Sequence, residues 1–312
     1  MIAASRFDDL PVLGQLPPAQ AIAKLRELGD HATADDLQAA QPRGRMRGGF
    51  SLAELWPLRS GPAPAFIHTA HAFGYVERTP SRTGLLSIQH PGNINADQSL
   101  KNSRIRVTLN RLRVSKYPGS GTHRILFDFY SRNQVADKTE ELHFNATFRA
   151  YEGEEAAVIG YPIFVGLNVG ADGIVFGCHT VNVANDDDQM LLDFLDSDIF
   201  KAGLHLASTL QPAIAPLTGM ALGLTKAVGR RNQNISVQDF YIGLDFGNDP
   251  MGARLAEGAY LAVQIPQAAQ LAWDWEEWGF NPINGQIVNR TDARQLVPYN
   301  YLVFGVGRYA GA

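Results

Sequence analysis

Alternating apolar and polar residues recur along most of this chain and predict β-strands. In the stretch 104–110, Ile105, Val107 and Leu109 alternate with arginine, threonine and asparagine. Because successive side chains of a strand point to opposite faces of a sheet, this period of two indicates a strand with one buried face. The same alternation occurs around 125–130, 142–149, 240–246, 261–265 and 301–306.

Turn residues separate two further expected strands by a short interval. The segments 160–169 and 173–183 have the composition of strands, and Gly170-Ala171-Asp172-Gly173 joins them. Glycine and aspartate tolerate the positive φ angles of tight turns. We therefore expect these two segments to pair with each other as an antiparallel β-hairpin.

One long stretch has the period of a helix instead. Between 186 and 231 apolar residues recur at helical spacing, and the part from Ala202 to Thr225 contains no Asp, Glu, Lys or Arg. Its two prolines argue against a single membrane-spanning helix, so two short helices are expected, roughly Gly203 to Leu210 and Leu217 to Val228. A surface so poor in charge must be covered by the protein's own sheet, a second copy, a partner or lipid.

A smaller helical segment lies near the beginning of the chain. Apolar residues from 22 to 28 have helical spacing, Gly29 is suited to end that helix, and a second helix is expected near 33–40. The basic, glycine-rich segment 41–49 is typical of a linker. This pattern divides the chain into a helical appendage with its linker, 1–49, and a β-sandwich domain, 50–312.

These elements together predict the fold class. Strands both precede and follow the one substantial helical region, which favours an insertion into a sheet protein over repeated βαβ units. We expect a mainly β protein, an antiparallel two-layer β-sandwich with an inserted helical segment at about 186–231 and a small N-terminal helical hairpin. A length of 312 residues fits one such domain with appendages.

Composition and charge narrow the classes of function. A formal net charge of −4 leaves no surplus of Lys and Arg for a phosphate backbone, so no nucleic acid partner is expected. The single cysteine, Cys178, excludes an internal disulfide and a cysteine-rich metal site within one chain. Residues 1–10 lack the apolar core of a signal peptide, and we expect a cytoplasmic protein.

A group of aspartates at the start of the inserted segment is one candidate site. Calcium is held by several carboxylates that converge from a loop, but the same residues could cap a helix and form its solvent face. No cofactor is expected unless they hold calcium. The candidate calcium ligands are Asp186, Asp187, Asp188, Asp193 and Asp196.

Two apolar groups are the other candidates. Three of the four tryptophans lie within six residues, which predicts either a lid on the sandwich or an anchor for a partner. Apolar residues of the second inserted helix could pack on the sheet, on a partner or on a second copy. The candidate interface residues are Trp273, Trp275, Trp278, Leu217, Met220 and Leu224.

The motifs that mark many enzymes are absent from the sequence. It has no G-x-S-x-G, no P-loop, no H-E-x-x-H and no dinucleotide fingerprint. We expect a non-catalytic β-sandwich that acts as a binding or assembly module through its surfaces, with a protein partner or with itself. The alternatives are a peripheral membrane protein with a calcium-binding Asp-rich loop, and a hydrolase or carbohydrate-active protein whose tryptophans stack on sugars.

Overall fold

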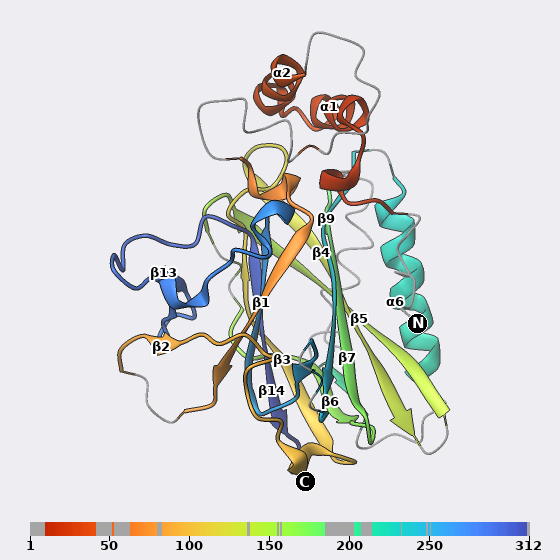
Figure 1. The fold of residues 1–312 in the computed structure, drawn as a ribbon. Helices are drawn as coiled ribbons and strands as arrows, with labels where there is room; N and C mark the ends of the chain where they lie inside the picture. Colours follow the sequence, from red (N-terminus) through yellow and green to blue (C-terminus); the bar gives the residue numbers. More distant parts are fainter. Residues whose placement is uncertain are drawn as a thin grey trace.

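Two β-sheets packed face to face form the body of the protein in the computed structural model (Figure 1). The structure describes residues 10–41, 52, 63–79, 83–135, 138–154, 156, 158–184, 203–206, 214–231, 233–247, 249 and 251–310. The fold is mainly β and has the sandwich arrangement that the sequence predicts. A small third sheet lies on one outer side of the sandwich, and a helix lies on the other (Figure 1).

Sheet A has five strands and sheet B has six. Sheet A has the order β10 (Ala253–Arg254), β9 (Ile235–Asp245), β7 (Gly173–Asn182), β4 (Thr122–Val135) and β5 (Lys138–Tyr151). Sheet B has the order β1 (Ala70–Glu77), β11 (Gly258–Ile265), β14 (Tyr301–Arg308), β3 (Arg104–Arg113), β6 (Tyr161–Asn168) and β8 (Leu204–His205). Sheet C has the order β13 (Ile287–Asn289), β12 (Trp278–Phe280) and β2 (Leu86–Ser87).

Neighbouring strands are antiparallel throughout sheet C and in most of the two large sheets. The exceptions are the short pairs β10 with β9 and β6 with β8, which are parallel. The described helices are α1 (Pro18–Glu27), α2 (His31–Ala40), α6 (Ile214–Gly229) and the 3₁₀ turns η1 (Leu13–Gln15), η3 (Ala65–Ile67), η4 (Gln98–Leu100), η7 (Gln267–Ala269) and η8 (Trp275–Glu277).

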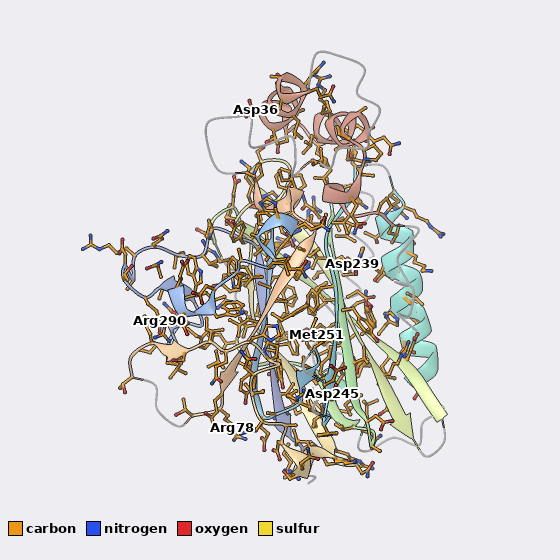
Figure 2. All side chains as sticks on the ribbon, in the orientation of Figure 1. Asp36, Arg78, Asp239, Asp245, Met251 and Arg290 are labelled. Atoms are coloured by element: carbon orange, nitrogen blue, oxygen red, sulfur yellow. The ribbon has the colours of Figure 1, made fainter. Side chains whose placement is uncertain are left out.

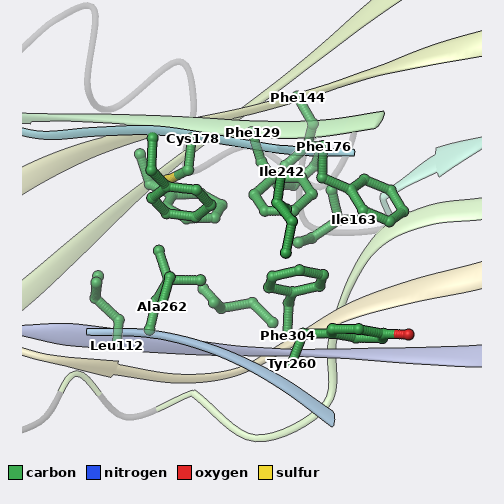
Figure 3. Close-up of a cluster of buried hydrophobic side chains, with 14 of the residues drawn as sticks. Leu112, Phe129, Phe144, Ile163, Phe176, Cys178, Ile242, Tyr260, Ala262 and Phe304 are labelled. Atoms are coloured by element: carbon green, nitrogen blue, oxygen red, sulfur yellow. The ribbon is translucent and has the colours of Figure 1, made fainter. Parts of the chain in front are cut away.

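The main core lies between sheets A and B and follows from the alternation in the sequence. Phe129 of β4 contacts Phe176 of β7 and Phe304 of β14, with ring centroids 5.7 and 5.3 Å apart, so aromatic rings join the two layers (Figure 3). Cys178 lies in the same cluster and is fully buried. Burial raises the pKa of its thiol, which makes it a core residue and a poor nucleophile.

The predicted hairpin between 160–169 and 173–183 is wrong in its pairing, although both strands exist. β6 pairs with β3 and β8 in sheet B, whereas β7 pairs with β4 and β9 in sheet A. The turn at Gly170 to Gly173 therefore crosses from one layer to the other. The residues of this turn only reverse the direction of the chain. Which strands β6 and β7 pair with depends on the burial of each strand in its own sheet.

The N-terminal helical hairpin forms as the sequence predicts. Gly29 has a φ of 76°, and the amide of Asp30 donates to the carbonyl of Leu25, which ends α1. The Asp30 carboxylate then accepts from the amide of Thr33 at 3.2 Å and caps α2. Apolar residues of α1 and α2 belong to the same buried cluster as the sandwich core, so the hairpin is packed onto the domain.

The inserted segment is described in part. The helix expected at 217–228 is α6, which covers the outer face of sheet A at the edge formed by β4 and β5 (Figure 1). The prediction of a helix at 203–210 is wrong for residues 203–206, the part of this segment that the structure describes. Leu204 and His205 form the short strand β8 instead, which pairs with β6 at the edge of sheet B.

Candidate ligand groove on the outer face of sheet B

The tryptophan cluster attaches sheet C to sheet B. Trp275 and Trp278 are each 7% exposed, and the Trp273 and Trp278 rings stack at 6.1 Å. The indole Nε1 of Trp275 donates to the carbonyl of Phe73 in β1 at 2.8 Å. A Cβ added to Gly74 would lie 2.9 Å from the Trp275 ring, so that ring rests directly on β1. The cluster covers an outer face of the sandwich, not one of its ends.

Sheet C covers only part of the outer face of sheet B. Along β14, the outward residues are large beneath sheet C and are glycines beyond its edge. Tyr301 and Val303 pack beneath sheet C in a second hydrophobic cluster. The next outward residues on the same strand are Gly305 and Gly307, which line a groove of about 880 Å³. We call this space the sheet B groove, and its floor is formed by Val76, Ala259, Gly305, Gly307, Thr108 and Arg106.

Strand register arranges this floor in two neighbouring rows. In the first row, Val76 pairs with Ala259, Ala259 with Gly305, and Gly305 with Thr108. The second row contains, in order across the strands, Gly307, Arg106, Val165 and His205. Together the rows cross all six strands of sheet B, a width of roughly 24 Å at about 4.8 Å per strand. The groove therefore runs across the strands and suits an elongated ligand.

The two glycines lower the floor in the middle of the groove. A Cβ built on Gly307 would have its nearest neighbour, Glu257 Oε2, at 3.7 Å, so open space lies above this residue. Gly305 is covered in part, because its added Cβ would lie 2.7 Å from Thr108 Oγ1 and 2.8 Å from Asn110 Nδ2. Neither glycine has a positive φ, so the backbone does not require glycine at these positions.

The two halves of the groove differ in chemistry. On the side of β3, the Thr108 hydroxyl donates to Asn110 Oδ1 at 2.9 Å, and the exposed Arg106 lies next along the strand face. On the side of β1 and β11, Leu86 and Phe280 of sheet C form an apolar wall. These residues are joined there by Val76 and Ala259 of the floor.

An ion pair closes the lower rim of the groove. Arg78, at the lower end of β1 in Figure 2, donates through Nη1 to Glu257 Oε2 at 2.7 Å. The same carboxylate oxygen accepts from the backbone amide of Arg308 at 3.0 Å. The Arg308 guanidinium is held in turn by the carbonyl of Ser99 at 2.8 Å. The rim is thus fixed by contacts within the protein.

A second polar cluster lies on the opposite layer, beneath α6. The Asp128 carboxylate of β4 is fully buried and contacts His143 Nδ1 of β5 at 2.9 Å. The Thr225 hydroxyl of α6 donates to Asp128 Oδ2 at 2.8 Å and accepts from Asn145 Nδ2 at 2.6 Å. Tyr130 stacks on His143 with ring centroids 5.3 Å apart. Because these groups bond to one another, we interpret the cluster as the polar contact that docks α6.

Three buried histidines are held neutral by their surroundings. Burial lowers the pKa of His68 to about 4 and that of His71 to about 3. Burial also lowers the pKa of His179 to about 4, against an opposing effect of the Asp128 carboxylate. The Nε2 atom of His179 bonds to the Ser236 hydroxyl at 2.9 Å. Among the described residues no group of three His, Cys, Asp or Glu side chains is placed to hold a metal ion.

The residues proposed from sequence are distributed as follows. Asp186, Asp187, Asp188, Asp193 and Asp196 lie outside the described residues, so the calcium site stays a prediction. The side chain of Leu217 is likewise outside the description, Met220 is 48% exposed, and Leu224 packs half-buried against the cluster of Leu126, Val181 and Val228. Trp273 is half-buried beside Trp275 and Trp278.

Sequence reasoning did not identify the sheet B groove. The signal was present in the last strand, where Gly305 and Gly307 alternate with Phe304 and Val306. A glycine at every second position leaves one face of a strand bare, and glycine inside a strand marks close approach of a ligand or another backbone. The neighbouring signal was Arg106 and Thr108, outward residues of the strand at 104–113.

Comparisons with models of protein families, with curated proteins and with solved structures find no match for this chain. Within the part of the chain that the structure describes, no helix is long and apolar enough to cross a membrane.

Proposed function

We propose that this protein is a non-catalytic binding module and that the sheet B groove is its binding site. The observation that carries the proposal is the glycine floor of β14, a central strand of a six-stranded sheet, which is open at Gly307 and partly covered at Gly305. Glycine inside a regular element destabilises it by about 0.5–1 kcal/mol relative to alanine. The side chains of Thr108 and Asn110 fill the space above Gly305, whereas the open space above Gly307 is explained by a ligand that approaches the backbone closely.

The size and lining of the groove support a small or elongated ligand. A volume of about 880 Å³ lies within the usual range for small-molecule sites. Its lining combines apolar residues of sheet C and of the floor with polar groups at β3 and at the end of β1, so a ligand can both bury apolar surface and form hydrogen bonds there. We propose that the protein acts in the cytoplasm.

A fragment screen by ligand-observed NMR tests this proposal. We expect the Gly307→Leu variant to lose the fragments that bind the native protein, because the leucine side chain would project into the open groove. The variant should be folded, since its Cβ has no neighbour nearer than 3.7 Å and strands accept leucine readily.

The matched control is Gly243→Leu, an exposed glycine of β9 with no atom within 4 Å of an added Cβ. It places the same side chain on the outer face of the other sheet and should leave every bound fragment unaffected. Fragments that bind both variants equally well would show that the groove is not the binding site.

Self-association through α6 is the second candidate function. Gly219, Met220, Gly223 and Ala227 form an exposed side of α6 without charge over two turns, and small residues permit close approach of a second helix. We propose a second copy of the chain as the occupant. Light scattering of the native protein and of Met220→Glu tests it. A concentration-dependent dimer that the charge abolishes supports the candidate, and a monomer at all concentrations contradicts it.

A further inference from the structure

If the proposed binding function is correct, the arginine side chain that has no partner among the described residues indicates which class of ligand the sheet B groove binds. Three arginines line the groove, and two of them are engaged within the protein. Arg78 pairs with Glu257, and Arg308 is bound to Ser99. Arg106 is exposed, and its guanidinium makes no hydrogen bond or ion pair with the residues that the structure describes. One guanidinium therefore remains available to a ligand.

Other polar side chains of β3 line the groove together with Arg106. Because the Thr108 hydroxyl donates to Asn110 Oδ1, the amide of Asn110 is held with Nδ2 over Gly305. Asn110 and Arg106 are outward residues of the same strand, and both line the groove at β3. A planar, acceptor-rich group such as a carboxylate matches this set, since arginine binds carboxylates through two parallel hydrogen bonds.

Two carboxylates lie at the groove: Glu77 lines it, and Glu257 belongs to its rim. Glu257 is neutralised by Arg78 and by the amide of Arg308. Glu77 is exposed at the end of β1, which is separated from β3 by three strand spacings, or about 14 Å. At that distance in water its charge is largely screened from Arg106. The end of the groove at β3 is therefore a site for an anion.

The opposite end of the groove is suited to an apolar group. Val76, Ala259, Leu86 and Phe280 form an apolar surface at β1 and β11, with the charged Glu77 and Arg78 beside it at the end of β1. The glycine floor connects this apolar end with Arg106. A ligand that spans the floor would bury its apolar part against sheet C and keep its acidic group in contact with donors.

We infer that the sheet B groove binds an amphipathic organic anion, with its carboxylate at Arg106 and Asn110 and its apolar body over Gly305 and Gly307 toward Phe280. A fatty acid and an aryl carboxylate share this chemistry. The shape of the apolar body distinguishes the two sources, so both are included in the test.

Isothermal titration calorimetry with octanoate, 4-phenylbutyrate and the neutral octanamide tests the inference. We expect the two acids to bind about tenfold or more tightly than the amide, the effect of one charge-assisted contact. Arg106→Gln should reduce the affinity for the acids to that for the amide. Arg104→Gln is the matched control, because Arg104 is exposed on the same face of β3 but does not line the groove.

The outcomes separate this inference from the proposed function. Equal affinities for octanoate and octanamide, or unchanged binding of the acids to Arg106→Gln, would overturn the anion assignment. If neutral fragments bind in a manner sensitive to Gly307→Leu while no acid binds, the groove is a binding site for another ligand class and the inference fails. If neither acids nor fragments bind, both the inference and the proposed function fail.

Discussion

The hydroxyl of Thr225 provides a direct test of how α6 is held on sheet A. It donates to the buried Asp128 carboxylate at 2.8 Å and accepts from Asn145 Nδ2 at 2.6 Å. Thr225→Val keeps the shape of the side chain and removes both hydrogen bonds. A hydrogen bond to a charged group contributes about 1.5–3 kcal/mol, and an amide left without its acceptor adds to the loss. We expect a destabilisation of about 2–4 kcal/mol.

Urea denaturation measures this effect, and hydrogen exchange of the α6 amides locates it. Thr225→Ser is the matched control, since it keeps the hydroxyl and loses one buried methyl group, worth about 1 kcal/mol. We expect faster exchange in α6 for the valine variant than for the serine variant. A valine variant within about 0.5 kcal/mol of the native protein, or a serine variant as unstable as the valine one, would refute the docking role of Thr225.

Three further predictions concern other contacts of the fold. Gly177→Ala should destabilise the protein by about 1–3 kcal/mol in urea denaturation, because the added Cβ would lie 2.0 Å from the Tyr130 ring. Trp275→Phe should accelerate hydrogen exchange in β12 and destabilise the protein by about 1 kcal/mol, since it removes the 2.8 Å bond to the carbonyl of Phe73. His71→Phe should reduce the pH dependence of stability, because burial lowers the pKa of His71 to about 3.

The sign of the pH effect follows from proton uptake on unfolding. In the unfolded chain His71 titrates near its ordinary pKa of 6.5, whereas in the folded protein it stays neutral down to a pKa of about 3. Stability is therefore complete above pH 6.5 and is lost as the pH falls toward 3. Each such histidine contributes a slope of about 1.4 kcal/mol per pH unit in this window. Identical slopes for His71→Phe and the native protein between pH 5.5 and 4.5 would contradict the neutral, buried state.

Gly243→Ala is the control for Gly177→Ala, because nothing lies within 4 Å of its added Cβ. It should change the free energy of unfolding by less than about 0.5 kcal/mol. If Gly177→Ala and Gly243→Ala destabilise the protein equally, the effect comes from the β-sheet propensity of alanine and not from a clash with the Tyr130 ring. For Trp275→Phe, unchanged exchange in β12 would show that sheet C does not depend on the indole bond to β1.

The elements of the sandwich were predictable from sequence because burial of one face imposes a period of two. Ile105, Val107 and Leu109 alternate with polar residues, and each lies in the core between the sheets. The pairing of strands was not predictable from the same pattern. The turn after β6 has hairpin residues, yet the chain crosses to the other sheet there, since a turn sequence carries no information on which strand lies opposite.

The outward residues of the strands were harder to interpret. Asp128 and His143 alternate with apolar residues like any solvent-facing pair, but α6 buries both of them. Only the position of the inserted helix distinguishes a polar docking cluster from a solvated face. The tryptophans show the same limit. Their clustering favoured a lid on one end of the sandwich over an anchor for a partner, whereas their packing on β1 depends on sheet C. For the groove, alternate glycines in a strand were the available signal.

The central claim is that ligands bind across the glycine floor of the sheet B groove, and a crystal structure with a bound ligand tests it most directly. Crystals of the native protein soaked with the acid that binds most tightly in calorimetry should show density over Gly305 and Gly307, with the carboxylate at Arg106. Density for that acid at another surface, such as the exposed side of α6 or the tryptophan cluster, with water alone in the groove, would contradict the account.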